Sequence, residues 1–252
     1  MRIKLTLAYD GTGYHGWQLQ KNQQTIQGVV EKGLAQICSR PVRVHGSGRT
    51  DAGVHALGQT AHFDPPARQA GLPWQKALNS LLPENIRILQ AGSVDNDFHA
   101  RYSVLSKTYS YTFWTEQDFI LPQRRLYVWK TGPLDLCALK NASAPILGAH
   151  DFKAFMNKGT KVNTTWRKIT DISFHPGLYP QELVVRITAD GFLKQMVRNI
   201  IGALVIVGRK KYPQDYLLQI LKTKNRNQAP ATAPARGLCL ESVEYPRQYG
   251  AH

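Results

Sequence analysis

The sequence predicts an α+β fold, and two observations lead to that class. Stretches with an apolar residue at every second position alternate with stretches whose apolar residues recur every three or four positions. In the first hundred residues, the predicted order is strand, helix, strand, strand, helix, strand, which is a layered α+β pattern and not a doubly wound one. With 252 residues, 42% of them hydrophobic, the chain can bury the core of one large or two modest domains.

The elements of the first half follow in order. Residues 3–9 alternate apolar and polar side chains, which is typical of a half-buried strand. Residues 9–18 continue it as a Gly-rich turn with three aromatic side chains, which we expect to be exposed. Thr25 is placed to cap a helix whose apolar side runs from Ile26 to Ile37. Further strands are expected at 42–45, 59–63 and 85–91, and a second helix at 74–82.

The second half repeats this style. In a strand at 107–114, Tyr109, Tyr111 and Phe113 share one face, and we assign the last two to the core. A polar stripe containing Arg198 lies on a helix at 192–207 that is otherwise apolar and therefore buried. The remaining predicted elements are a helix at 136–147 and strands at 167–175, 182–188 and 238–245. A boundary near 101–106 divides the chain into domains 1–103 and 104–252.

The charge points to a polyanionic partner. Lys and Arg number 32 against 17 Asp and Glu, which gives a net charge of +15 and a sequence pI near 9.9. Nucleic acid binding is strengthened when each neutralised phosphate releases a counterion. The basic residues are dispersed and do not gather on one amphipathic helix, which favours nucleic acid over a membrane surface. The basic stretch 222–227 is a candidate RNA contact.

Cysteine usage and hydropathy suggest a cytoplasmic protein. The three cysteines, Cys38, Cys137 and Cys239, show no paired spacing, so we expect neither a disulfide framework nor a zinc site. The N-terminus lacks the hydrophobic core of a signal peptide. The longest apolar run, 200–207, is too short to cross a bilayer.

The most distinctive stretch is 46–59. Gly46, Gly48 and Gly53 mark a sharply bent loop that can aim the carboxylate of Asp51 and the guanidinium of Arg49 outwards. The Gly-Lys-Ser/Thr string of a phosphate-binding loop is absent. On its own, the pattern also fits an aspartate that only closes a turn beside a solvated arginine.

The string Gly48–His55 resembles the Gly-Arg-Thr-Asp-Ala-Gly-Val-His signature of the TruA-type tRNA pseudouridine synthases. Ser47 stands where alanine is common in that family. Further similar motifs follow in the right order over nearly the whole chain. They lie at 9–18, at 98–101 with 107–111, at 148–152, at 196–199 and at 233–238.

The resemblance implies a role for five side chains. Asp51 would be the catalytic carboxylate, acting either as the nucleophile at C1′ or as the base that draws a 2′ proton. Arg198 would form a salt bridge with Asp51 and keep it ionised, because a nearby guanidinium favours the charged carboxylate. Tyr109 would stack on the target base, and its hydroxyl can pass a proton. Arg49 would help to expel the base from its stack, and Leu238 would lie against the uracil.

The resemblance also implies an architecture and a substrate. The fold would be two ferredoxin-like halves whose antiparallel sheets join into one extended sheet, with the active-site cleft between them. A homodimer would bind tRNA and isomerise uridines 38, 39 and 40 of the anticodon stem-loop, without a metal or organic cofactor. Two alternatives stay open: an RNA-binding protein without catalysis, and a metal-dependent nuclease, for which the sequence shows no metal-ligand spacing.

Overall fold

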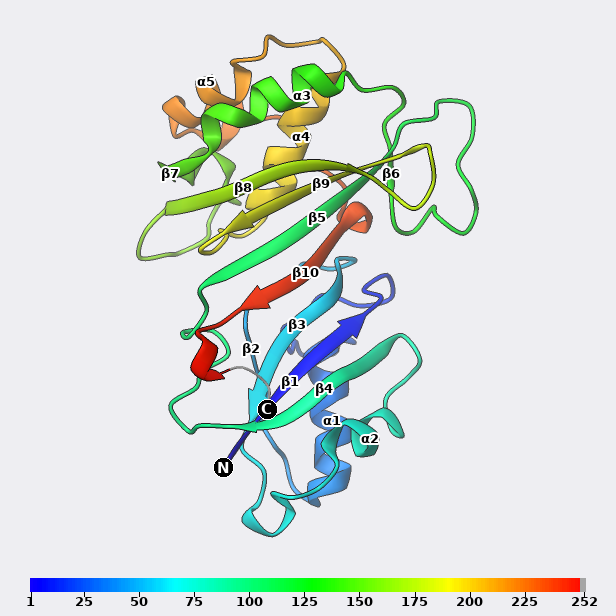
Figure 1. The fold of residues 1–252 in the computed structure, drawn as a ribbon, viewed down its shortest axis with the longest axis vertical. Helices are drawn as coiled ribbons and strands as arrows, with labels where there is room; N and C mark the ends of the chain where they lie inside the picture. Colours follow the sequence, from blue (N-terminus) through cyan, green and yellow to red (C-terminus); the bar gives the residue numbers. More distant parts are fainter. Residues whose placement is uncertain (250–252) are drawn as a thin grey trace. The chain divides into compact units, whose positions relative to one another are not determined.

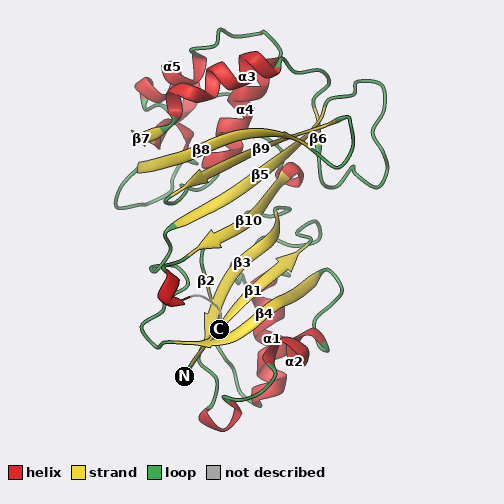
Figure 2. Cartoon of the chain, viewed as in Figure 1, coloured by secondary structure: helices red, strands yellow, loops and turns green. Residues whose placement is uncertain are grey.

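The computed structural model describes residues 1–249 and divides the chain into two compact units. Unit 1 comprises Met1–Lys107 together with the chain from Cys239 onwards, and unit 2 comprises Thr108–Leu238. The expected division into 1–103 and 104–252 differs from this one mainly in the last segment, which returns to unit 1. Both units combine helices with mostly antiparallel strands, which confirms the α+β class (Figure 2).

Unit 1 has its strands in the order β4-β1-β3-β10, with the short β2 paired to β3. β10 runs parallel to β3, and the other pairs are antiparallel. Helix α2 packs against β4 and α1 (Figure 1). The elements are β1 (Arg2–Tyr9), α1 (Ile26–Cys38), β2 (His45–Gly46), β3 (His55–Phe63), α2 (Trp74–Asn79), β4 (Ile86–Val94) and β10 (Leu238–Glu244).

Local chemistry explains the first two elements of unit 1. Ile3, Leu5 and Leu7 of β1 are at most 2% exposed while their neighbours are only partly buried, as the alternating pattern predicts. Thr25 is the N-cap of α1, and its hydroxyl accepts a hydrogen bond of 3.2 Å from the amide of Gly28. Both predictions are confirmed.

Unit 2 has the strand order β5-β9-β8-β7, with β6 parallel to β5. Helices α3, α4 and α5 pack against one another (Figure 1). Tyr111 and Phe113 of β5 are fully buried, which confirms their assignment to the core. The elements are β5 (Ser106–Trp114), β6 (Trp129–Lys130), α3 (Leu136–Ser143), β7 (Gly148–Asp151), β8 (Trp166–Pro176), β9 (Glu182–Ala189), α4 (Met196–Gly208) and α5 (Tyr216–Thr223).

Three predictions about elements were wrong or incomplete. Residues 42–44 form no strand, and side chains of α1 bind the backbone of Val44 in place of a neighbouring strand. The helix expected at 192–207 begins only at Met196, because Gln195 has a left-handed backbone with φ of 62°. Helix α5 was not predicted, although Leu217, Ile220 and Leu221 have helical spacing and are buried.

Helix α4 is the buried centre of unit 2. A side chain at Gly202 would place its Cβ 2.3 Å from the carbonyl oxygen of Ala231, so the glycine allows the loop after α5 to lie directly on the helix.

Within residues 1–249, none of the helices combines the length and the apolar character that a bilayer span requires.

Candidate active site

The loop between β2 and β3, residues 47–54, carries the predicted catalytic aspartate, and we call it the Asp51 loop. Ser47 and Thr50 point into the protein, whereas Arg49 is exposed and Asp51 is partly exposed. Gly53 has a φ of 75°, as its predicted role in a bent loop requires. The loop therefore buries its small polar side chains and presents its charged ones.

Residues 9–18, the first motif of the chain, pack against this loop. The hydroxyl of Tyr9 lies 2.8 Å from that of Thr50, and the carbonyl of Thr50 accepts a hydrogen bond of 3.1 Å from the amide of Trp17. The amide of Gly53 donates to the carbonyl of Tyr14. Tyr9, Tyr14 and Trp17 are at most 4% exposed. The expectation that these aromatics are exposed was wrong: they hold the loop in place.

Gly46, just before the loop, is required by this packing. Its φ is not positive, so the reason is not a left-handed backbone. A Cβ at this position would lie 2.6 Å from the indole ring of Trp17. The glycine predicted from turn chemistry is thus explained by close approach to the first motif.

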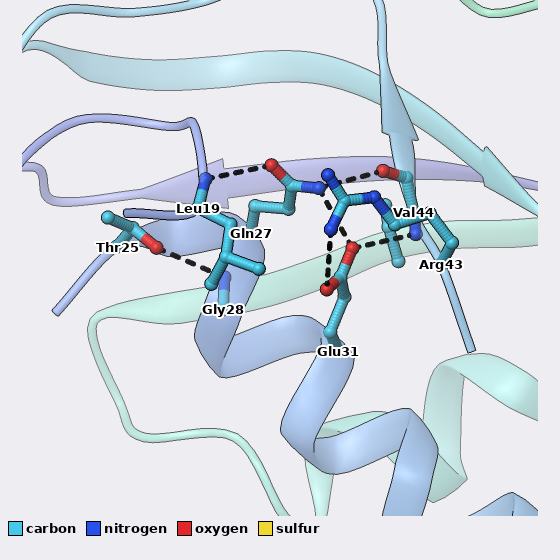
Figure 3. A network of polar contacts seen from close by, with 7 residues as sticks. All are labelled: Leu19, Thr25, Gln27, Gly28, Glu31, Arg43 and Val44. Atoms are coloured by element: carbon cyan, nitrogen blue, oxygen red, sulfur yellow. Dashed lines mark hydrogen bonds and ion pairs between the residues drawn. The ribbon is translucent and has the colours of Figure 1, made fainter. Parts of the chain in front are cut away.

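Helix α1 fixes the chain that leads into the Asp51 loop (Figure 3). The buried amide of Gln27 donates to the carbonyl of Val44 at 3.1 Å, and the carboxylate of Glu31 accepts from the amide of Val44 at 2.9 Å. Gln27 also donates to Glu31 at 2.8 Å, and Arg43 forms an ion pair with the same carboxylate at 3.4 Å. Two side chains thus satisfy both backbone groups of Val44, as a neighbouring strand would.

Lys107 anchors the loop from β5. Its ammonium group donates a hydrogen bond of 2.6 Å to the carbonyl of Ser47. The hydroxyl of Ser47 donates in turn to Gln59 at 2.7 Å, and Gln59 donates to the carbonyl of Gly48 at 3.2 Å. Burial, together with the smaller effect of the nearby charge of Arg101, lowers the pKa of Lys107 to about 8. The ammonium group of Lys107 therefore holds the backbone of Ser47, four residues before Asp51.

The lowered pKa of Lys107 predicts a pH dependence of stability. In the unfolded chain, lysine has a pKa of 10.5, so between pH 8 and 10.5 the unfolded state holds the proton more tightly than the folded state. Below pH 8 the folded state bears the full free-energy cost of burying the charged ammonium group. This cost decreases as the pH rises from 8 towards 10.5. We expect the wild type to gain up to about 1.4 kcal/mol per pH unit over this window relative to Lys107→Met. Urea unfolding at several pH values measures this, and parallel pH profiles of the two proteins would refute it.

Three predicted site residues lie in unit 2. Tyr109 is 8% exposed, and its ring meets that of Phe192 edge to face with 5.2 Å between centroids. The guanidinium of Arg198 donates to the carbonyl of Ala233 at 2.8 Å, while the amide of Ala233 donates to the carbonyl of Arg198 at 3.1 Å. Leu238 is 6% exposed at the start of β10. The loop after α5 thus restrains the side chain of Arg198.

A buried polar network holds that loop against α4. The side chain of Asn199 is fully buried and donates to the carbonyl of Phe155 at 2.7 Å. Its oxygen accepts from Arg226 at 2.9 Å and from the hydroxyl of Thr232 at 2.7 Å. Arg226 is thereby used within the fold, and Lys224 forms an ion pair of 3.2 Å with Asp151. The basic stretch 222–227 therefore has structural roles as well as its predicted RNA contact.

Replacement of Asn199 by alanine is expected to destabilise the protein by about 2–4 kcal/mol. The change leaves a guanidinium group, a hydroxyl and a carbonyl without their buried partner. The exposed Asn141 on α3, which donates to Gln214 at 3.1 Å, offers a matched control, and Asn141→Ala should change stability by less than about 0.5 kcal/mol. Equal unfolding midpoints for the two variants in urea would show that the network does not stabilise unit 2.

The structure groups the predicted residues by unit. Asp51 and Arg49 belong to unit 1, and Tyr109, Arg198 and Leu238 belong to unit 2. The Asp51–Arg198 salt bridge would connect the units and stays a prediction, as does a cleft between them. Among residues 1–249, no group of three or more His, Cys, Asp or Glu side chains is arranged to hold a metal ion.

Sequence reasoning missed the residues that support the Asp51 loop. Gln27 and Glu31 lie on α1, and Lys107 lies on β5, all far along the chain from the loop they bind. Lys107 lies within residues 107–111, which resemble a motif of the family. This resemblance was the one signal in the sequence that could have pointed to Lys107. The two residues of α1 fit an ordinary polar helix face, and nothing in their spacing indicates a backbone partner.

Comparison with known proteins shows the family of the chain. A model of the tRNA pseudouridine synthase family matches residues 6–103 and 142–246. The tRNA pseudouridine synthase A of Maridesulfovibrio salexigens is 53% identical, with 97% of this chain and 90% of that protein covered. The enzymes of the same name from Solidesulfovibrio magneticus and Coxiella burnetii are 50% and 40% identical, over 97% and 98% of this chain and 91% and 94% of those proteins. The chain therefore belongs to the tRNA pseudouridine synthase family.

Proposed function

We propose that this protein isomerises uridine to pseudouridine at positions 38, 39 and 40 of the tRNA anticodon stem-loop. The observation that carries the proposal is the Asp51 loop. Trp17 and Lys107 bind its backbone and Tyr9 binds the side chain of Thr50, while Asp51 stays partly exposed within the family signature. A catalytic group held in this way needs no reorganisation at the moment of reaction.

The reaction is an internal exchange of bonds. The N1–C1′ bond breaks, the uracil turns, a C5–C1′ bond forms, and the proton lost from C5 is balanced by one gained at N1. No redox partner is needed, because uracil can itself carry the departing negative charge. Asp51 acts either as the nucleophile at C1′ or as the base that takes the 2′ proton, and both routes require its ionised form.

Four other side chains complete the proposed site. Arg198 forms a salt bridge with Asp51 and orients it. Arg49, which is exposed on the same loop, takes the place of the extruded base. Tyr109 stacks on the uracil and can carry a proton, and Leu238 packs against the ring. The net charge of +15 supports binding of the tRNA body, and we further propose that the enzyme works as a cytoplasmic homodimer.

Mapping of pseudouridine on transcribed tRNA tests the proposal. Purified protein is incubated in EDTA with transcripts that carry uridine at positions 38, 39 or 40, and with matched transcripts that carry cytidine there. Carbodiimide labelling and primer extension should reveal pseudouridine only in the uridine transcripts. Binding without modification would support the RNA-binding alternative, and metal-dependent cleavage would support the nuclease alternative.

A further inference from the structure

Four aromatic rings of unit 1 are connected by ring contacts around the buried ring of His62. His62 of β3 is 1% exposed and lies almost parallel to His45 of β2, at 5.1 Å between centroids. His99 meets His62 edge to face with 4.7 Å between centroids, and the ring of Tyr102 lies at 4.3 Å from that of His99, tilted by 33°. Tyr102 at the outer end is 75% exposed. We call these four residues the aromatic stack.

Backbone hydrogen bonds fix the chemical state of two of these histidines. The amide of Ala100 donates to Nδ1 of His62, and the amide of Arg101 donates to Nδ1 of His99, both at 3.1 Å. Each Nδ1 must therefore carry a lone pair, so the rings are neutral with the proton on Nε2. Burial lowers the pKa of both rings, that of His62 to about 3. The histidines therefore present flat, uncharged faces.

The outer ring is held by a well-anchored loop. The carbonyl of His99 accepts from the amides of Tyr102 and Ser103 at 3.1 and 2.9 Å, and the hydroxyl of Ser103 accepts from the amide of His99 at 3.0 Å. The hydroxyl of Tyr245 donates to the carbonyl of Ala100 at 2.6 Å. An exposed aromatic ring on such a backbone can bind a partner without a large ordering cost.

The aromatic stack lies close to the Asp51 loop. His45 belongs to β2, which runs directly into the loop, and Asp51 lies six positions further along the chain. That separation limits the distance between their Cα atoms to about 20 Å. Arg101, whose guanidinium lies 5.6 Å from the Tyr102 ring centroid, also lowers the pKa of Lys107, the loop's anchor. A nucleotide chain that reaches Asp51 thus has its neighbouring nucleotides within range of the stack.

We propose that Tyr102, backed by His99 and His45, is a stacking platform for an unpaired base of the RNA substrate, with Arg101 on an adjoining phosphate. This inference rests on the proposed function, because it takes tRNA as the ligand. An unpaired base offers the flat face that a tyrosine ring can cover, and such stacking tolerates any base identity. The platform lies outside the signature loop and binds RNA beside the target nucleotide.

The test compares binding and salt dependence of variants made in an Asp51→Asn background, so that no turnover occurs. Tyr102→Ala should weaken binding of a transcribed tRNA by about 5- to 140-fold, and Tyr102→Phe should bind within about twofold of the parent. The slope of log Kd against log salt should be unchanged in Tyr102→Ala, and Arg101→Gln should lower it by about 0.7–0.9. Tyr212, which is 49% exposed and stacked on Tyr216 at 4.3 Å, is the matched control, and Tyr212→Ala should bind like the parent.

Three results would overturn the proposal. Unchanged affinity in Tyr102→Ala, with the wild type active on tRNA, would refute the platform alone. A change of molecular mass in Tyr102→Ala by light scattering would show that the stack contacts another protein chain. Absence of both tRNA binding and pseudouridine formation in the wild type would refute the proposed function, and the platform with it.

Discussion

Replacement of Asp51 by asparagine is expected to reduce the single-turnover rate of pseudouridine formation on the order of 10⁴-fold. Asparagine has nearly the same shape as aspartate, but it can neither attack C1′ nor take the 2′ proton. The loop itself should keep its structure, because its anchors use Ser47, Thr50 and Gly53. The Kd for tRNA should therefore stay within about fivefold of the wild-type value.

The matched control for this variant is Glu84→Gln. Glu84 is an exposed carboxylate of the same unit outside the Asp51 loop, so the same change of charge should leave the rate unaltered. Equal rate losses in the two variants would indicate a general effect of charge on tRNA binding. A near-normal rate in Asp51→Asn would remove Asp51 from the chemistry altogether.

Replacement of Arg198 by methionine is expected to reduce the rate about 10²-fold, because the proposed salt bridge that orients Asp51 would be lost. Arg198→Lys should retain more activity, since the charge remains. It loses the guanidinium geometry and the hydrogen bond from Nε to Ala233. Single-turnover measurements at saturating enzyme separate these effects from tRNA affinity.

A double-mutant cycle tests the predicted salt bridge itself. The unfolding free energies of Asp51→Asn, Arg198→Met and their combination should show a coupling of about 0.5–3 kcal/mol, as contacting residues do. The same cycle built with Glu84→Gln in place of Asp51→Asn should be additive. Additivity in both cycles would show that Asp51 and Arg198 do not interact in the free protein.

Much of the fold could be predicted because local patterns determine it. The alternation in β1 and the N-cap Thr25 depend only on neighbouring residues, and both were confirmed. The strand predicted at 42–45 was wrong for residues 42–44, for a non-local reason. Val42 and Val44 are buried as their apolar pattern suggests, but the backbone partners of Val44 are the side chains of Gln27 and Glu31 on α1. Such partners depend on tertiary packing and leave no periodic signal.

The difference between local patterns and tertiary contacts also decides how much of the site could be predicted. The resemblance of Gly48–His55 to the family signature singled out Asp51 and Arg49 as predicted site residues, because the composition of the loop alone also fits an aspartate that only closes a turn. The burial of Tyr14 and Trp17 could not be predicted, since a Gly-rich turn at a strand end is usually exposed. These aromatics are buried through tertiary contacts, among them Trp17 with Gly46 and the backbone of Thr50.

Release of tritium from tRNA carrying 5-tritiated uridine, in the presence of EDTA, tests the central claim most directly. Isomerisation must exchange the hydrogen at C5, so the wild type should release one tritium for each pseudouridine formed, without any added metal or cofactor. Asp51→Asn should release none above background. Failure of the wild type to release tritium from a mixed tRNA pool that it binds would contradict the account, as would equal release by the two proteins.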